Sequence, residues 1–290
     1  MKDFAGVGLA LLAAVSWGGG DFSGGMGVKS TGGSTRGALR IIVTAHAVSL
    51  AVLGLILGRR MAFPFHDPSA LWGLGCGVVA GLSLSAFYIA LARGTMGVSA
   101  AISGLLAAAI PAAVGTVLEG RPSPVQLAGF ALAALAIWWI AAPVAGAPPE
   151  PPGVMRLAIG GGIGFGLYFA GLKFANPLGI LVPMALARTG SLATCLLLLA
   201  LLRGKPASGA TWLNRAGWLW ACGVALLDTG GNLLYIAATR AGRLDVAAVL
   251  ASLYPASTIL LAAGLLHERP GRRQLLGMGM AVAAVVLVTI

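Results

Sequence analysis

The chain has 290 residues, of which only 9% are charged and 58% are hydrophobic, with a net charge of +11 and a mean hydropathy of +0.94. Soluble domains carry about 25% charged residues, and soluble monomers avoid the large apolar patches that this composition would expose. The composition therefore excludes an ordinary soluble domain and predicts an integral membrane protein. Basic residues lie singly between apolar runs, which suits loops facing anionic lipid rather than nucleic acid.

The apolar runs are long and do not alternate at period two, which excludes a membrane β-barrel and leaves α-helices. The first run, 4–24, has no A-x-A-like cleavage site, so we interpret it as a spanning helix rather than a signal peptide. A spanning helix needs about 20 mostly apolar residues. In chain order the sequence predicts ten of them, over 4–24, 38–57, 69–92, 98–118, 124–142, 154–172, 180–202, 216–238, 245–266 and 274–290.

A proline-rich linker, 144–153, divides the chain into halves of 1–143 and 154–290. An offset of 148 residues brings side chains of the two halves into register: Trp72 with Trp220, Arg121-Pro122 with Arg269-Pro270, Gln126 with Gln274, and Gly129 with Gly277. Two consecutive units with an odd number of spans enter the membrane from opposite sides. The predicted fold class is therefore an all-α polytopic membrane protein of ten transmembrane helices in two inverted five-helix repeats, which is a transporter architecture.

Glycines at one-turn spacing predict close helix packing in the membrane. One stripe is formed by Gly73, Gly77 and Gly81, and two further pairs lie in the sixth helix, Gly160 with Gly164 and Gly162 with Gly166. The three cysteines, Cys76, Cys195 and Cys222, lie inside apolar spans at unrelated spacings and are interpreted as small packing residues.

Intramembrane ionisable residues are candidates for function because they are costly in hydrocarbon. Four stand out: Asp21, His46, Arg188 and Asp228. We interpret His46 as a packing residue and Arg188 as a structural partner of a carbonyl or helix end. Asp228 shares a helix face with Asn232 and Tyr235, at i+4 and i+7, and has no basic residue nearby on its own helix. It is expected to face a cavity, where it would attract a substrate ammonium group or carry a coupling proton.

Two prolines and two acids complete a recognisable pattern. Pro111 and Pro255 lie in the fourth and ninth helices, while Glu119 and Glu268 lie near helix ends and are followed by Arg-Pro. With ten helices in two repeats, the chain resembles EamA-type members of the drug/metabolite transporter superfamily and is similar to bacterial amino-acid exporters of the YddG type. One departure is that Glu268 falls on Gly120 at the repeat offset, so the acid has slipped by one residue. Pro111 and Pro255 are either static kinks or gating hinges.

The resemblance implies that helices one, three, six and nine line a central cavity, and that both termini are cytoplasmic in the bacterial inner membrane. The basic residues of the loops leave this orientation open, because the two halves favour opposite assignments. With the aromatic residues of these helices and the polar face of Asp228, the predicted substrate site comprises Trp17, Asp21, Tyr88, Phe165, Tyr168, Phe169, Asp228, Asn232, Tyr235 and Tyr254.

The sequence shows no HExxH, GxSxG or Walker pattern, and we expect no enzyme activity, cofactor or metal site. The first hypothesis is a monomeric exporter of aromatic or neutral amino acids or related metabolites, working by alternating access. The second is a transporter of the same fold for cationic drugs or other metabolites. A membrane enzyme or scaffold is the third class. An acidic, aromatic cavity favours ammonium-bearing or aromatic solutes.

Overall fold

The computed structural model describes residues 2–58, 66–140, 150–202, 212–265 and 271–289, and every regular element in these ranges is helical. In chain order the elements are α1 (Lys2–Ser30), α2 (Thr35–Leu57), α3 (Pro68–Arg93), α4 (Met96–Glu119), α5 (Pro124–Ile140), α6 (Val154–Ala175), the 3₁₀ turn η2 (Asn176–Leu178), α7 (Leu181–Leu201), α8 (Arg215–Ala241), α9 (Leu244–Ala251), α10 (Tyr254–Leu265) and α11 (Arg272–Thr289).

Within these ranges nine segments are long and apolar enough to cross a membrane, and α5 is a shorter apolar helix of 17 residues. Their positions match the ten expected spans. Large apolar side chains point outward from the bundle, as lipid-facing residues do: Leu55 and Val117 are each 83% exposed and Leu226 is 75% exposed. The predicted fold class, an all-α multi-pass membrane protein, is confirmed.

The ninth expected span, 245–266, is confirmed as a span over Leu244–Leu265 but is not one continuous helix. It is broken into α9 and α10, with Ser252 and Leu253 between them, and residue 266 lies outside the described ranges. The cause is Pro255, which lacks an N–H and whose ring clashes with the carbonyl four residues earlier, that of Ala251. Ala251 is the last residue of α9. Pro111, by contrast, lies inside the unbroken helix α4, so the two prolines shape their helices differently.

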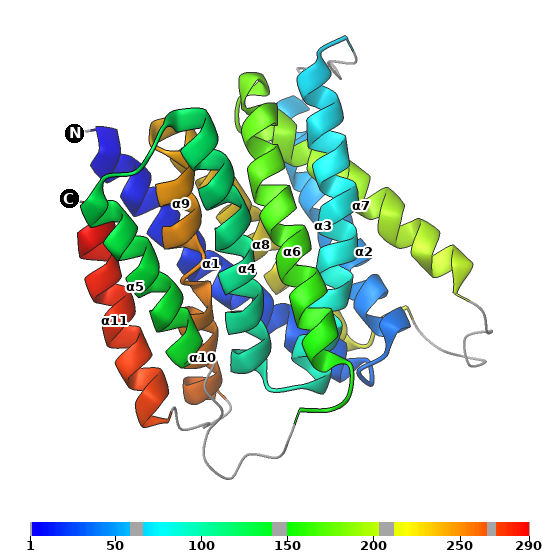
Figure 1. Ribbon diagram of the computed structural model, residues 1–290. Helices are drawn as coiled ribbons and strands as arrows, with labels where there is room; N and C mark the ends of the chain where they lie inside the picture. The colour runs from blue at the N-terminus through cyan, green and yellow to red at the C-terminus, as the bar shows by residue number, and fades with distance from the viewer. Residues whose placement is uncertain (1, 59–65, 141–149, 203–211, 266–270, 290) are drawn as a thin grey trace.

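The two halves interlock (Figure 1). α1 packs mainly on α8, and α6, at the corresponding place in the second half, packs on α3. Likewise α1 contacts α9 and α10, whereas α6 contacts α4. This exchange of partners is what a twofold relation between the halves predicts. Superposition of the halves by a rotation about an axis in the membrane plane remains a prediction.

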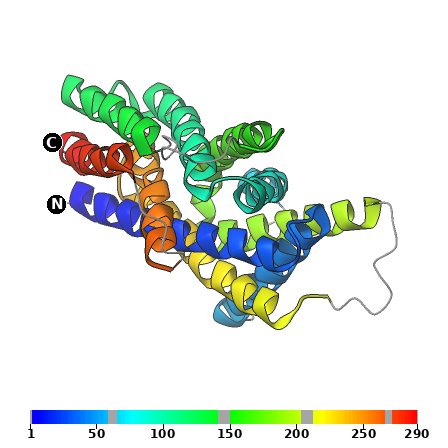
Figure 2. The ribbon, with the colours of Figure 1, turned by 90° about the horizontal axis from the view of Figure 1, so that it is seen from below.

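The pair α5 and α11 lies side by side at one edge of the bundle (Figures 1 and 2). Both helices contribute a glycine to the contact, and these glycines are the ones matched at the repeat offset. A Cβ added to Gly129 would lie 2.7 Å from Cγ2 of Val288, and one added to Gly277 would lie 2.8 Å from the carbonyl oxygen of Ala136. Neither position has room for a side chain, so each helix brings a glycine to the contact and the two helices approach closely.

The glycine stripe on α3 packs against α7. Added Cβ atoms would lie 3.0 Å from Cβ of Leu186 at Gly73, 2.2 Å from the carbonyl oxygen of Ala187 at Gly77, and 3.0 Å from Oγ of Ser191 at Gly81. The expected close approach of helices is therefore confirmed here. On α6, Gly162 and Gly166 meet α4 at Ser103 and Ile110, and Gly164 meets Ser83 of α3. Gly160 meets no neighbour, so the expected pair Gly160–Gly164 is not a packing stripe.

Candidate functional site

Three consecutive glycines of α1, residues 18–20, let this part of the helix pack closely against helices of the second half. A Cβ added to Gly18 would lie 2.4 Å from Cβ of Ser257 in α10, and one added to Gly20 would lie 3.1 Å from the backbone nitrogen of Asp228 in α8. Trp17 and Asp21 flank this run, one helical turn apart, and so share a face. The glycines thus bring both side chains against α8 and α10.

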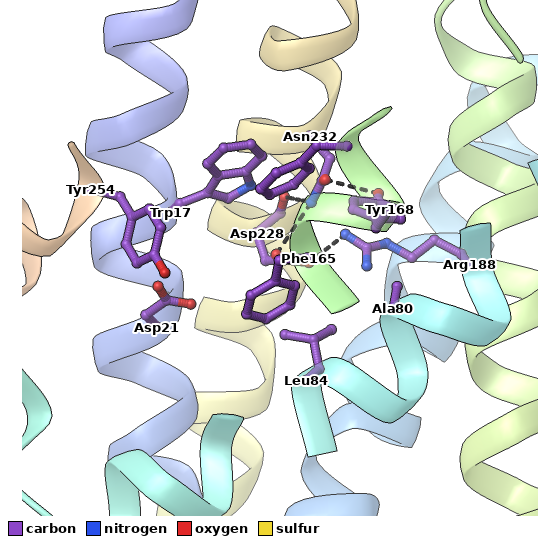
Figure 3. Close-up of a pocket in the computed structure, with 11 residues that line it drawn as sticks. Trp17, Asp21, Ala80, Leu84, Phe165, Tyr168, Arg188, Asp228, Asn232 and Tyr254 are labelled. Atoms are coloured by element: carbon purple, nitrogen blue, oxygen red, sulfur yellow. Dashed lines mark hydrogen bonds and ion pairs between the residues drawn. The ribbon is translucent and has the colours of Figure 1, made fainter. Parts of the chain in front are cut away.

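A pocket lies on this face, between the two halves (Figure 3). Its walls come from α1 and α3 of the first half and from α6, α7, α8 and α10 of the second: Trp17, Asp21, Ala80, Leu84, Phe165, Tyr168, Phe169, Arg188, Asp228, Asn232 and Tyr254. Its volume is small, about 30 Å³, so a solute of amino-acid size requires the walls to move.

An ion pair forms one wall of the pocket. Arg188 Nη2 donates to Oδ2 of Asp228 at 2.5 Å, and the two residues are 2% and 7% exposed. The same nitrogen also donates to the hydroxyl of Thr229 at 3.0 Å. The guanidinium of Arg188, on the neighbouring helix α7, thus offsets the free-energy cost of burying the Asp228 carboxylate in the membrane. Both members of the pair line the pocket rather than lying away from it.

His46 of α2 belongs to the same network and is not simply a packing residue. Arg188 Nη1 lies 2.6 Å from Nε2 of His46, which is 1% exposed. Arginine has no acceptor atom, so Nε2 must accept and the ring proton must lie on Nδ1. His46 is therefore a neutral imidazole in this arrangement, and its 3.9 Å approach to Asp228 is not an ion pair. The Nδ1 atom has no partner among the described residues.

Amide and hydroxyl groups extend the network along α8. Asn232 donates from Nδ2 to Oδ1 of Asp228 at 3.2 Å and to its backbone carbonyl at 2.7 Å, and Oδ1 of Asn232 accepts from the hydroxyl of Tyr168 at 2.8 Å. On the other side, Thr229 donates to Oγ of Ser49 at 2.7 Å. The face that carries Asp228 is thus held by side chains from α2, α6 and α7.

Stacked rings form the second wall. The Trp17 and Phe169 centroids are 4.6 Å apart with an interplanar angle of 18°, and Phe165 lies 6.2 Å from Phe169 at 16°. The indole of Trp17 can lie there because Gly231 has no side chain: an added Cβ would be 2.6 Å from Cδ1 of the indole. Offset stacks of this kind stabilise aromatic pairs, and their faces also attract cations.

Asp21 and Tyr254 lie beside each other at one side of the pocket, with the carboxylate and the phenol hydroxyl pointing toward each other (Figure 3). Asp21 is 7% exposed and Tyr254 is 3% exposed. Among the described residues the Tyr254 hydroxyl has no hydrogen-bond partner, and no ion pair to Asp21 is found there. Neither group is therefore paired within the protein's described residues, and both are available to a bound solute.

Of the predicted site residues, the pocket brings together Trp17, Asp21, Phe165, Tyr168, Phe169, Asp228, Asn232 and Tyr254. Two others lie behind its walls. Tyr88 is fully buried with its ring against Gly24 of α1, and Tyr235 is fully buried with its ring centroid 5.4 Å from that of Trp17.

Sequence reasoning assigned Arg188 a structural role and left out Ala80 and Leu84. Arg188 could have been predicted as a pocket residue, because it is a charged residue deep in a span. Ala80 and Leu84 lie one turn apart on α3, so they share a helix face.

Comparisons with known proteins agree with this architecture. Residues 154–290 match the EamA-like transporter family. One solved crystal structure is similar over 96% of both chains with a TM-score of 0.71 at 15% sequence identity, which shows a shared fold. No curated protein sequence matches the chain.

Proposed function

We propose that this multi-pass membrane protein, whose residues 154–290 match the EamA-like transporter family, exports small solutes that carry an ammonium group, amino acids or related metabolites. Transport would proceed by alternating access of the two halves around the central pocket. We place the protein in the inner membrane of a bacterium with both termini in the cytoplasm.

The observation that carries this proposal is the pocket shared by the two halves. It combines buried carboxylates, a stacked aromatic wall and an amide–phenol pair, with side chains from six helices. Polar and ionisable groups facing an interior cavity are how membrane proteins mark a solute pathway. Carboxylates and ring faces both attract ammonium groups, whereas a phosphate or sulfate would require basic residues that do not already have an acidic partner.

The polar lining of the pocket also supports transport over a scaffold role. A cavity of about 30 Å³ admits water but no amino acid. The polar groups that line it are costly to bury, and a protein that only needed to pack these helices could have used apolar side chains. A solute that enters an expanded form of the pocket would satisfy groups such as the Tyr254 hydroxyl, which has no partner in the described ranges.

The test is uptake into liposomes that contain the purified protein, across a panel of amino acids and related amines, with and without a proton gradient. We expect saturable flux of at least one panel member above that of protein-free liposomes. Trp17→Ala should lower this flux at least tenfold, because it removes the ring that faces Phe169. Trp138→Ala is the matched control, since Trp138 is 67% exposed on α5 and does not line the pocket.

Absence of flux for every panel member, with protein that is folded and correctly inserted, would contradict the proposal. Flux that is equal in wild type and Trp17→Ala would show that solutes cross elsewhere.

A further inference from the structure

We propose that the solute held in the central pocket is a monocation, an amine without a free carboxylate, and that Asp21 is the residue that binds its ammonium group. This inference rests on the proposed function and narrows its substrate class. It distinguishes simple amines and the amides and esters of amino acids, which are monocations, from free amino acids, which carry the same ammonium group but are zwitterions.

Asp21 is buried without a partner of opposite charge, so its carboxylate form is costly in the empty pocket. When Asp21 is ionised, the charges around the pocket sum to one uncompensated negative charge. Arg188 and Asp228 cancel each other as an ion pair with 2.5 Å between Nη2 and Oδ2. His46 is neutral, because its Nε2 accepts a hydrogen bond from Arg188. Of the groups that line the pocket, Asp21 is then the ionisable side chain without a partner of opposite charge. A single positive charge on the solute neutralises the site.

The hydrogen-bonding groups beside Asp21 also fit an ammonium group. An ammonium has three donor hydrogens and no acceptor, so it requires oxygen atoms around it. The carboxylate of Asp21 and the phenol oxygen of Tyr254 point toward the same space (Figure 3). Tyr254 is 3% exposed and its hydroxyl is unpartnered in the described part of the chain. Trp17, one turn before Asp21, adds a ring face for the cation or for the apolar body of the solute.

A free carboxylate on the solute would have to share the positive charge of Arg188 with Asp228. The two terminal nitrogens of Arg188 already donate to Asp228, Thr229 and His46. A guanidinium has five N–H groups, so two remain: the second N–H of Nη1 and that of Nε, which is buried without a partner among the described residues. Binding a zwitterion would leave the site with a net negative charge and add a third carboxylate to Asp21 and Asp228. Buried charges without compensation are strongly disfavoured.

The experiment measures binding of tritiated 2-phenylethylamine to the purified full-length protein by scintillation proximity, with unlabelled competitors. L-phenylalanine is the matched zwitterion, and L-phenylalaninamide keeps the same body with the carboxylate replaced by a neutral amide. Ethylamine and alanine form a second, smaller pair, so that body size is not confused with charge.

In wild type we expect each amine to bind at least tenfold more tightly than its zwitterion. Asp21→Asn should weaken amine binding at least tenfold and leave phenylalanine binding unchanged or improved, because the pocket then carries no net charge. Asp21→Glu should retain the amine preference. Asp67→Asn is the control: Asp67 caps the start of α3, and asparagine caps equally well.

Zwitterion binding as tight as amine binding in wild type would overturn the inference, and this measurement needs no variant to fold. Equal losses of binding affinity for amine and zwitterion in Asp21→Asn would also overturn it, since the Asp21 carboxylate would then not distinguish a cation from a zwitterion. Either result leaves the proposed function in place if liposome flux of an amino acid is observed. Absence of flux for every solute in the panel contradicts the proposed function instead.

Discussion

Nζ of Lys173 lies 2.6 Å from Oε1 of Glu119, so an ion pair joins the last residue of α4 in the first half to the last turn of α6 in the second. The other oxygen of Glu119 accepts the backbone N–H of Leu244 at 2.7 Å, at the start of α9. One carboxylate therefore ties three helices together at the end of the bundle where α1 begins.

The Glu119–Lys173 pair should contribute a modest coupling energy. The side chains are 19% and 26% exposed, and partly solvated pairs are worth about 0.2–1 kcal/mol. We expect Glu119→Gln and Lys173→Met each to lower the free energy of unfolding in detergent, and a double-mutant cycle to show a coupling of about 0.5–1 kcal/mol. Strict additivity of the two variants would mean that the pair is not formed.

The buried pair at the pocket should behave differently. Removing one member of a buried ion pair leaves an uncompensated charge and costs about 3–5 kcal/mol. We therefore expect Arg188→Met to destabilise the protein by that amount in a detergent unfolding assay. The double variant Arg188→Met/Asp228→Leu should recover most of this loss, because it leaves no unpaired charge. If the double variant is as unstable as the single one, the loss comes from packing rather than charge.

Gly77 should not tolerate a side chain. An added Cβ would lie 2.2 Å from the carbonyl oxygen of Ala187, which is backbone and cannot move aside alone. Gly77→Ala should therefore destabilise the α3–α7 contact by about 1–3 kcal/mol. Gly75→Ala is a matched control on the same helix, because an added Cβ there meets nothing within 4 Å. Equal melting temperatures for the two variants would contradict the close approach of α3 and α7.

Pro255 should matter more for transport than Pro111. Pro255 follows the break between α9 and α10, next to the pocket residue Tyr254, whereas Pro111 lies in a continuous helix. Pro255→Ala restores the missing N–H and should slow liposome flux severalfold while the protein stays folded. Pro111→Ala should change flux less. Unchanged turnover in both variants would assign both prolines to static kinks rather than hinges.

Both ends of the chain should report the same side of the membrane. Phe4 and Val7 of α1 line a cavity of about 170 Å³ together with Val288 and Thr289 of α11, so the first and last helices meet at one end of the bundle. We expect a cytoplasm-active reporter to be active, and a periplasm-active reporter inactive, when fused to either terminus. Opposite readings at the two ends would contradict the ten-span topology, and the reverse reading at both would reverse the orientation.

The fold was largely predictable because its signals are local. Apolar runs of the required length set the spans, and the one-turn spacing of Gly73, Gly77 and Gly81 indicated a packed face. The break before Pro255 was the exception, although it follows from the proline ring acting on the carbonyl of Ala251.

The site was predictable residue by residue but not as an arrangement. Asp228 required a partner on another helix, yet nothing in the sequence selects Arg188 of α7 or His46 of α2. Their contacts depend on how α2, α7 and α8 meet, which no local pattern specifies. Tyr88 and Tyr235 show the same limit: both are aromatic residues in the expected helices, but packing places them behind the pocket walls.

The interlocked halves also impose an order on biosynthesis. α1 leaves the ribosome before α8, its main packing partner, and Gly20 meets the backbone of Asp228. At about 5–20 residues per second of synthesis, α1 waits about 10–40 s for this partner. During that time Asp21 and the glycine face have no second half to pack against. Chains that stop before α8 should therefore fail to assemble and be degraded, which makes the pocket one of the last features of the molecule to form.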